Sequence, residues 1–377
     1  MDPNDSEFLR IAVDYVNSKI TRGEIVDYDE ARTALTKSYM HILENPQIFI
    51  PAWHEQSKRT VCSITADRKK YGKKVERNLL KRYAAAFNAL DEALAAAELA
   101  NRAMNAAFRL WLHEAPREET YQKLFGIESV LGGHATRFLL LMGMHARMVV
   151  ISSEISLLLR KGYTDGAFSR IRTLYELVVK AFFLCTREPT PGGYELAERY
   201  YVSSLVERLK EGGDSDLDDE VSQEMISEAR KRWGDNFFKG ENNWAAPGTL
   251  NPASKRVTFK DIEDAVEGEA IRHVYLACNA AVHAGSLTVI GSADLHRSYF
   301  YNNRSSVDLS ATAYIGSTIT FFLLMGSVEV LRCLTTSMRE WDCALIAAAI
   351  FPCLNAAADL FNEQQERLGE EDSCEDE

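Results

Sequence analysis

The sequence predicts an all-α protein, and two observations support this prediction. Residues 59–113 form a run rich in alanine, leucine, lysine and glutamate, which are strong helix formers. Over residues 164–184, apolar side chains recur every three or four positions, as expected for a helix with one buried face. The sequence allows at most one small β-hairpin, which a weak signal places between residues 286 and 303.

Composition and charge indicate an ordinary soluble protein. Apolar residues make up 46% of the 377 residues, enough for a sizeable core. The net charge of -12 disfavours a surface that binds nucleic acid or anionic membrane throughout, so such binding would need a local basic patch. The most apolar runs are about twelve residues long, whereas a membrane span needs ~20. We therefore expect a cytoplasmic protein without membrane contact.

Two further observations agree with a cytoplasmic location. The seven cysteines form no CxxC motif and no zinc-like pairing with histidines, so we expect reduced, buried thiols. The first residues carry acidic side chains where a secretory signal peptide carries positive charge.

The first elements are predicted to be two short helices within residues 5–43. Gly23 separates them, and Asp27 or Asp29 is placed to open the second helix. Prolines and aromatic residues then indicate an ordered loop over residues 44–57.

A long helical hairpin is expected next. Its first arm is the alanine-rich run at residues 59–113, and its second arm extends over residues 119–161, which are nearly all apolar towards their end. Gly132 and Gly133 are expected to bend or break the second arm, because glycine costs about 1 kcal/mol relative to alanine inside a helix.

Shorter helices and a long loop fill the middle of the chain, and two long helices end it. The expected helices cover residues 164–184, 194–210, 217–233, 259–283, 310–339 and 340–365. Residues 234–257 contain Trp244 and two prolines and indicate a long loop, a feature that is often functional. Pro352 is expected to kink or break the last helix, and the acidic residues 367–377 to be disordered.

One predicted helix carries a polar stripe on an otherwise apolar surface. Arg172 and Glu176 lie one turn apart on this stripe, within residues 164–184. Two interpretations fit: the stripe is solvated, or it faces a polar pocket formed with another helix. Arginine before glutamate is the poorer order for a pair on an isolated helix, so local helix support explains the two residues weakly.

A later helix ends with Asn279 and His283 one turn apart, and Gly285 follows where a glycine favours a helix C-terminus. A histidine in this place is suited to general acid or base catalysis, with the amide orienting it or a phosphate. The alternative is a structural histidine that bonds a backbone carbonyl or stabilises the helix dipole.

Taken together, these segments resemble a known family. The segments that carry the resemblance are R-T-L-Y-E at residues 172–176, a loop with Trp244, T-F-K-D-I-E-D-A-V at residues 258–266 and Y-L-A-C-N-A-A-V-H-A-G at residues 275–285. Over residues 125–300 the chain resembles a bacterial family of unknown function. That family is distantly similar to the helical HEPN (higher eukaryotes and prokaryotes nucleotide-binding) domains.

The resemblance implies a domain organisation and an activity. A HEPN-like domain is expected over residues 121–366, after an N-terminal helical region with a long basic helix over residues 1–120 and before the acidic tail at 367–377. HEPN ribonucleases carry an arginine, a polar residue and a histidine on one helix and cleave RNA without metal as dimers. A homodimer is therefore expected.

The HEPN motif is incomplete in this chain. His283 and Asn279 match it, but Cys278 stands where the arginine is expected. Arg272 lies eleven residues before His283, about 16 Å along a helix. It cannot share a site with His283 without a kink or a partner chain. Either Arg172 supplies the positive charge from the other helix, or the activity is absent.

A local basic cluster lies between residues 58 and 82, where ten lysines and arginines stand against two acidic residues. Such a cluster is able to follow a phosphate backbone, with an aromatic side chain stacking on a base. The alternative is a solvated helix face that the acidic tail or a partner subunit neutralises. The candidate nucleic-acid-binding residues are Lys69, Lys70, Tyr71, Lys73, Lys74 and Arg77.

Two functions from different classes follow. The first is an intracellular HEPN-like effector, a toxin or antiphage defence component, that cleaves RNA without metal. His283 would be the general acid or base, Arg172 the phosphate-stabilising cation, and Asn279 and Glu176 the orienting groups. The second is a non-enzymatic scaffold or sensor that binds a partner protein or small ligand, with a structural polar network. Cys278 favours the second and the basic cluster the first. No motif indicates a cofactor or a metal.

Overall fold

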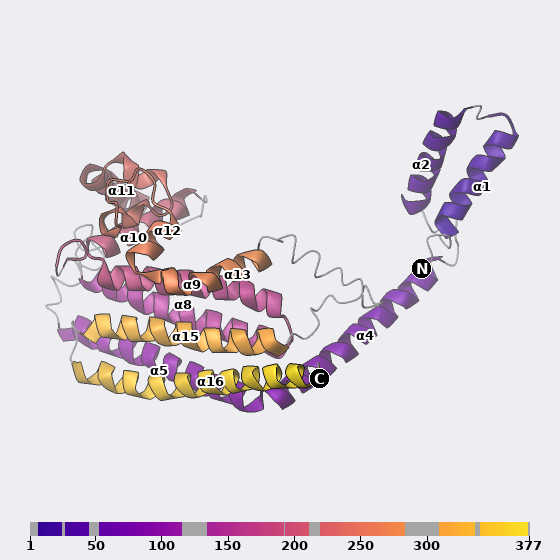
Figure 1. The fold of residues 1–377 in the computed structure, drawn as a ribbon. Coiled ribbons are helices and arrows are strands. Elements are labelled where there is room, and N and C mark those ends of the chain that lie inside the picture. Colours follow the sequence, from indigo (N-terminus) through magenta and orange to yellow (C-terminus); the bar gives the residue numbers. More distant parts are fainter. Residues whose placement is uncertain are drawn as a thin grey trace. The chain divides into compact units, whose positions relative to one another are not determined.

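The computed structural model confirms the predicted all-α class. It describes residues 7–24, 27–44, 53–114, 134–191, 193–210, 219–282, 309–335 and 340–375. Within these ranges every regular element is a helix (Figure 1). The predicted hairpin between residues 286 and 303 and the predicted break at Gly132 and Gly133 lie outside the described residues.

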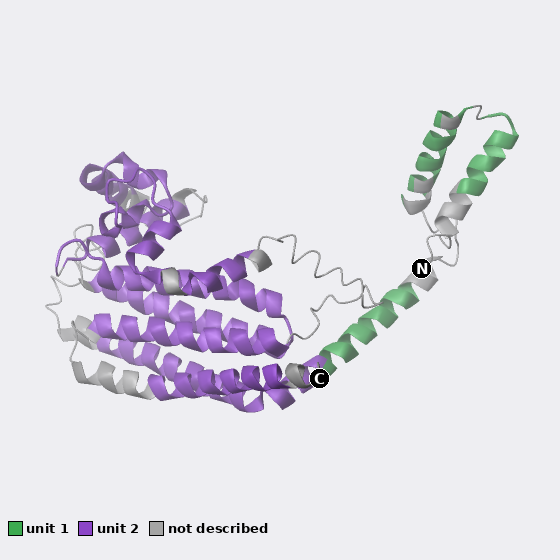
Figure 2. Ribbon diagram, in the orientation of Figure 1, with its two compact units in different colours: residues 1–74 green, residues 75–377 purple. Residues whose placement is uncertain are grey.

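The chain divides into two compact units, residues 1–74 and 75–377 (Figure 2). The division falls inside one long helix, α4 (Trp53–Arg82), upstream of the domain boundary predicted at residue 120. The next helix, α5 (Ala84–Glu114), packs against α8 (His134–Arg160) and α16 (Glu340–Glu375). These contacts make α5 part of the core of the second unit.

In the first unit, the two predicted short helices are α1 (Glu7–Thr21) and α2 (Tyr28–Glu44), and they pack against each other. Gly23 lies between them with φ +72°, a left-handed conformation that glycine adopts without steric cost. The carboxylate of Asp27 accepts a hydrogen bond of 2.7 Å from the backbone N–H of Glu30 and so caps the start of α2.

The core of the second unit is formed by long helices that lie side by side (Figure 1). Besides α5, α8 and α16 these are α9 (Thr164–Thr186) and α15 (Leu309–Thr335). Two glycines of α15 allow side chains of the neighbouring helices to come close to its backbone. A Cβ atom at Gly316 would lie 2.4 Å from the ring of Phe361 on α16, and one at Gly326 would lie 2.6 Å from Met148 Sδ on α8.

Shorter helices follow α9. They are α10 (Glu195–Lys210), α11 (Asp219–Trp233), η2 (Asp235–Lys239), η3 (Asn243–Gly248), α12 (Phe259–Ala265), η4 (Gly268–Ile271) and α13 (Arg272–Val282). The predicted loop at residues 234–257 therefore contains two short 3-10 helices. The one or two helices predicted at residues 259–283 correspond to three elements, α12, η4 and α13.

Trp244 anchors this loop in the core. Its side chain is 2% exposed, and its ring meets those of Phe183 at 5.6 Å and Tyr200 at 4.7 Å, both nearly edge to face. The buried guanidinium of Arg199 donates from Nε to the Trp244 carbonyl at 2.9 Å. The loop is thus held by packing and by a charged donor that satisfies a buried carbonyl.

Asn243, beside Trp244, joins two parts of the same loop through hydrogen bonds. Its Nδ2 donates to the carbonyl of Asn236 at 2.7 Å, and its Oδ1 accepts from the backbone N–H of Val257 at 2.8 Å. Because Asn243 is buried, these bonds replace hydration for the loop backbone.

The last helix differs from the prediction in two respects. α16 is continuous from Glu340 to Glu375 and includes Pro352, so no break occurs there. Its packing against α15 and α5 compensates for the hydrogen bond that proline removes. Residues 367–375 of the predicted disordered tail also belong to this helix.

Two helices of the described chain, Ala135–Arg160 and Leu309–Leu334, are long and apolar enough to cross a membrane by length and composition. Of the most apolar stretch, 50% is buried within the protein in the first helix and 67% in the second. Core helices of soluble proteins can have the same length and composition. The cytoplasmic location stays a prediction.

A buried histidine joins three of the long helices. His145 on α8 has its Nδ1 2.7 Å from Asn101 Oδ1 on α5 and its Nε2 2.8 Å from Ser327 Oγ on α15. Burial lowers the pKa of His145 from 6.5 to about 4. The ring is therefore neutral at neutral pH and serves as a polar link in the core.

His145 is expected to make the protein less stable in mild acid. Between pH 6.5 and 4 the unfolded state binds a proton at this histidine that the folded state does not. The contribution of neutral His145 to the free energy of unfolding is therefore complete above pH 6.5 and decreases as the pH falls towards 4. The loss by pH 4 is about 3 kcal/mol. Denaturant titrations from pH 7.5 to pH 4 should show it, and the His145→Gln variant should show a flatter pH dependence. Equal pH dependence in both proteins would contradict this assignment.

Candidate functional site

The predicted polar pair on α9 faces α13. Arg172 Nε lies 3.0 Å from Glu176 Oε1, and Arg172 Nη2 donates to the hydroxyl of Tyr275 at 3.2 Å. The Arg172 guanidinium also lies over the Tyr275 ring, 5.1 Å from its centroid. The stripe is therefore a contact between two helices as well as a partly exposed surface, since the side chains of Arg172 and Glu176 are 24% and 30% exposed.

The electrostatics keep Arg172 charged. Burial lowers the pKa of Arg172, but the hydrogen bond and charge of Glu176, together with Tyr275, raise it above its ordinary value. Burial raises the pKa of Tyr275, while Arg172 lowers it. The result is a positioned cation whose nearest described anion is a carboxylate on its own helix.

Asn279 lies one turn after Tyr275 on α13, and its buried Oδ1 has no hydrogen-bond partner among the described residues. An unsatisfied buried amide oxygen is costly, and each such group in a folded protein needs an explanation. His283, the predicted acid or base, lies outside the described residues, one position beyond the end of α13 at Val282. The structure therefore brings Arg172 and Glu176 beside the helix that carries Asn279.

Cys278 does not belong to this polar surface. It is fully buried, and burial raises the pKa of its thiol to about 11, against the lowering effect of Arg172. The chain position where the HEPN motif has its arginine thus points into the core.

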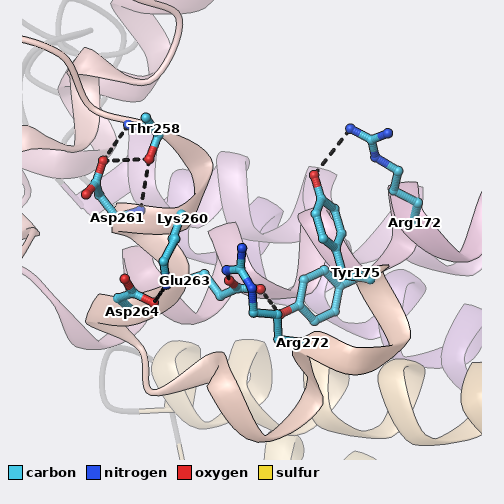
Figure 3. A network of polar contacts seen from close by, with 9 residues as sticks. Arg172, Tyr175, Thr258, Lys260, Asp261, Glu263, Asp264 and Arg272 are labelled. Carbon is cyan, nitrogen blue, oxygen red and sulfur yellow. Dashed lines mark hydrogen bonds and ion pairs between the residues drawn. The ribbon is translucent and has the colours of Figure 1, made fainter. Parts of the chain in front are cut away.

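A second polar network lies next to this surface and is drawn in Figure 3. The buried carboxylate of Glu263 on α12 accepts a hydrogen bond from the hydroxyl of Tyr175 and forms an ion pair with Arg272. Burial, followed by the bond to Glu263, raises the pKa of Tyr175 well above its ordinary value. The ring centroids of Tyr175 and Tyr275 lie 5.4 Å apart, so the two networks are in contact through these aromatic rings.

Local sequence explains how Glu263 is placed. Thr258 and Asp261 form a reciprocal capping box at the start of α12, two turns of helix in which Glu263 faces inwards. Gly268 then comes close to this side chain, because a Cβ atom there would lie 3.0 Å from Glu263 Cγ. Arg272, considered above as an alternative cation, is thus occupied by Glu263.

Sequence analysis missed Tyr275, Tyr175 and Glu263. Tyr275 is four residues before Asn279, so its spacing could have marked it as part of the same surface. Its side chain is partly exposed. Glu263 carried no comparable signal, because a single carboxylate in a polar segment looks the same whether it is buried or exposed.

The basic cluster lies on α4. The side chains of its candidate residues are exposed, and Tyr71 is 42% exposed. None of these lysines, nor Arg77, forms an ion pair with a described carboxylate. One of the two acidic residues in this segment, Glu76, instead pairs with Lys161. The exposed residues are Lys69, Lys70, Tyr71, Lys73, Lys74 and Arg77.

Among the described residues, no group of three or more His, Cys, Asp or Glu side chains could hold a metal ion. The surface between α9 and α13 offers hydrogen-bonding groups and one guanidinium, which can stabilise negative charge.

Comparisons with known proteins give one family. No curated protein and no solved structure matches the chain. The chain matches the model of a family of unknown function, in agreement with the predicted resemblance. The more distant similarity to HEPN domains stays a prediction. The matching model is DUF5677, a family of unknown function, and it covers residues 138–297, which include Arg172, Glu176, Tyr275 and Asn279.

Proposed function

We propose that the surface between α9 and α13 is the active site of an intracellular HEPN-like effector that cleaves RNA without metal. The observation that carries this proposal is the position of Arg172. Its guanidinium reaches from α9 to Tyr275, one turn before Asn279 and two turns before the position of His283 along the chain. This supplies from a second helix the positive charge that the motif lacks at Cys278.

Each residue has a chemical role in the proposed reaction. His283 removes the proton of the ribose 2′-hydroxyl or donates one to the leaving oxygen. Arg172 stabilises the charge that develops on the phosphate, and Glu176 fixes the orientation of its guanidinium through the 3.0 Å bond. The buried Oδ1 of Asn279, which has no partner among the described residues, orients the histidine or the substrate. A homodimer would place two such sites in one particle.

The basic cluster on α4 supports RNA as the substrate class. Its exposed lysines are unpaired with described carboxylates and so are available to phosphates, and the exposed ring of Tyr71 is available for stacking. In this proposal they bind the RNA backbone and contribute to affinity, whereas the α9–α13 surface carries the reaction.

RNA cleavage by the purified full chain in the presence of EDTA tests the proposal. The His283→Ala and Arg172→Ala variants are expected to lose cleavage by about 100-fold or more, because each removes a group that acts in the transition state. The matched control is Arg170→Ala, which removes an arginine of the same helix that pairs with Glu154. Circular dichroism checks that each variant folds.

The outcomes separate clearly. Retained cleavage in the Arg172→Ala variant, or an equal loss in the Arg170→Ala variant, would contradict the role of Arg172. Cleavage that EDTA abolishes would contradict a metal-independent reaction.

The absence of cleavage by the wild-type chain would favour a second function, a non-catalytic scaffold or sensor for a partner protein or small ligand. The specific observation in its favour is the pair between Arg172 and Glu176, which neutralises the cation within one helix. In that case Glu176→Gln should lower the stability of the fold without exposing any RNA-dependent activity.

A further inference from the structure

Two cysteines meet where α9 and α15 end and α8 begins. Cys185 is in the last turn of α9 and Cys333 in the last turn of α15, and both are partly buried. The thiol of Cys185 is hydrogen-bonded to Cys333 and also lies 3.8 Å from the carbonyl oxygen of Glu329. The two sulfur atoms are thus neighbours on adjacent helices.

Arg137 on α8 provides a positive charge to this pair. Its Nη2 lies 2.8 Å from Cys333 Sγ and 3.1 Å from the carbonyl oxygen of Cys185. Among the described residues, Arg137 forms no ion pair with a carboxylate, and its buried Nε has no hydrogen-bond partner. The sulfur of Cys333 is in contact with this guanidinium, and the Glu188 carboxylate is close enough for the charge of Arg137 to lower its pKa.

The other charges around the pair are Glu329 and Arg332, which bind each other on α15, and Glu188, which follows α9. The hydrogen bond from Cys185 lowers the pKa of Cys333 to about 7; burial opposes this effect and Arg137 strengthens it. The pKa of Cys185 is raised, first by its bond to Cys333 and then by burial. At neutral pH, therefore, about half of the Cys333 population is thiolate, whereas Cys185 is a thiol.

We propose that Cys333 and Cys185 form a peroxide-sensitive redox site, in which Cys333 is the attacking sulfur and Cys185 the resolving one. The Cys333 thiolate attacks one oxygen of a hydroperoxide. The S–O bond forms, the O–O bond breaks, and hydroxide (or alkoxide) leaves. Sulfur is oxidised by two electrons to a sulfenic acid, and the peroxide is reduced.

The second step closes a disulfide. The sulfur of Cys185 attacks the sulfenic sulfur of Cys333, the S–S bond forms, and the S–O bond breaks. The hydroxyl leaves with the proton of the Cys185 thiol as water, so no further oxidant is needed. The product links the end of α9 to the end of α15 covalently, and a dithiol reductant restores the two thiols.

Peptide mapping of the full chain after treatment with hydrogen peroxide tests the site. The expected product is a Cys185–Cys333 disulfide that dithiothreitol reverses. In the Cys185→Ser variant, a dimedone adduct should accumulate on Cys333 instead. At pH 7.5 the Arg137→Gln variant should react with peroxide about tenfold more slowly than the wild type, because the neutral thiol is a poor nucleophile. The Arg137→Lys variant should restore part of this rate.

Cys353→Ser is the matched control, since Cys353 is also partly buried, and it should leave the rate unchanged. Oxidation of Cys62 or Cys353 at the rate of Cys333 would overturn the proposal, as would an unchanged rate in Arg137→Gln. The mapping of the wild-type chain decides the pairing by itself if a variant fails to fold.

Discussion

Replacement of Glu263 by alanine is expected to lower the free energy of unfolding of the second unit by about 3–5 kcal/mol. The variant removes the only carboxylate that binds both Tyr175 and Arg272 in the described chain. The Tyr175 hydroxyl would stay buried without this acceptor, and Arg272 would lose its counter-charge. Chemical denaturation monitored by circular dichroism measures the change.

The neighbouring carboxylate gives a matched control for Glu263. Asp264 pairs with Lys260 at 2.8 Å, and their side chains are 34% and 56% exposed. Such a surface pair contributes about 0–1 kcal/mol, so Asp264→Ala should unfold almost like the wild type. A loss below about 1 kcal/mol in Glu263→Ala would show that the buried network does not stabilise the fold.

Replacement of Trp244 by alanine is expected to cost about 3–5 kcal/mol, because the cavity left by the indole cannot be filled by its neighbours. Trp244 is 2% exposed and lies between the rings of Phe183 and Tyr200, which belong to two different helices. Its loss would release the loop from α9 and α10. Denaturant unfolding and limited proteolysis of residues 234–257 both report this change.

Trp233 provides the comparison for Trp244. It is partly buried, and its ring contacts that of Phe237 at an interplanar angle of 47°, with ring centroids 5.0 Å apart. Trp233→Ala should therefore cost clearly less than Trp244→Ala. Equal losses in the two variants would mean that the loop is not anchored by Trp244 in particular.

Local patterns in the sequence were sufficient to predict most helices. The expected helix at residues 164–184 is α9, Thr164–Thr186, and Gly23 separates α1 from α2 as predicted. These signals depend on propensity, periodicity and capping, which act within a few residues. The predicted single run at residues 59–113 is divided at Tyr83 into α4 and α5, and the Tyr83 hydroxyl donates to the distant Leu309 carbonyl at 2.7 Å, a contact that no local pattern predicts.

The candidate site was predictable only in part for the same reason. Arg172 and Glu176 were identifiable because they interrupt an apolar pattern on one helix. The partner of Arg172 is Tyr275, 103 residues later, and that of Tyr175 is Glu263, 88 residues later. Helix periodicity shows that a face is polar but not which other helix covers it. Long-range pairing is decided by packing of the whole second unit.

The pairing of charges within the second unit has a consequence for ionic strength. Arg172 with Glu176 and Arg272 with Glu263 each pair a positive with a negative side chain, so these four residues add no net charge to the α9–α13 surface. A neutral surface releases few condensed counterions when it meets a nucleic acid, whereas the exposed lysines of α4 would release many. The salt dependence of any RNA association would therefore arise from α4, and that of the chemical step would be slight.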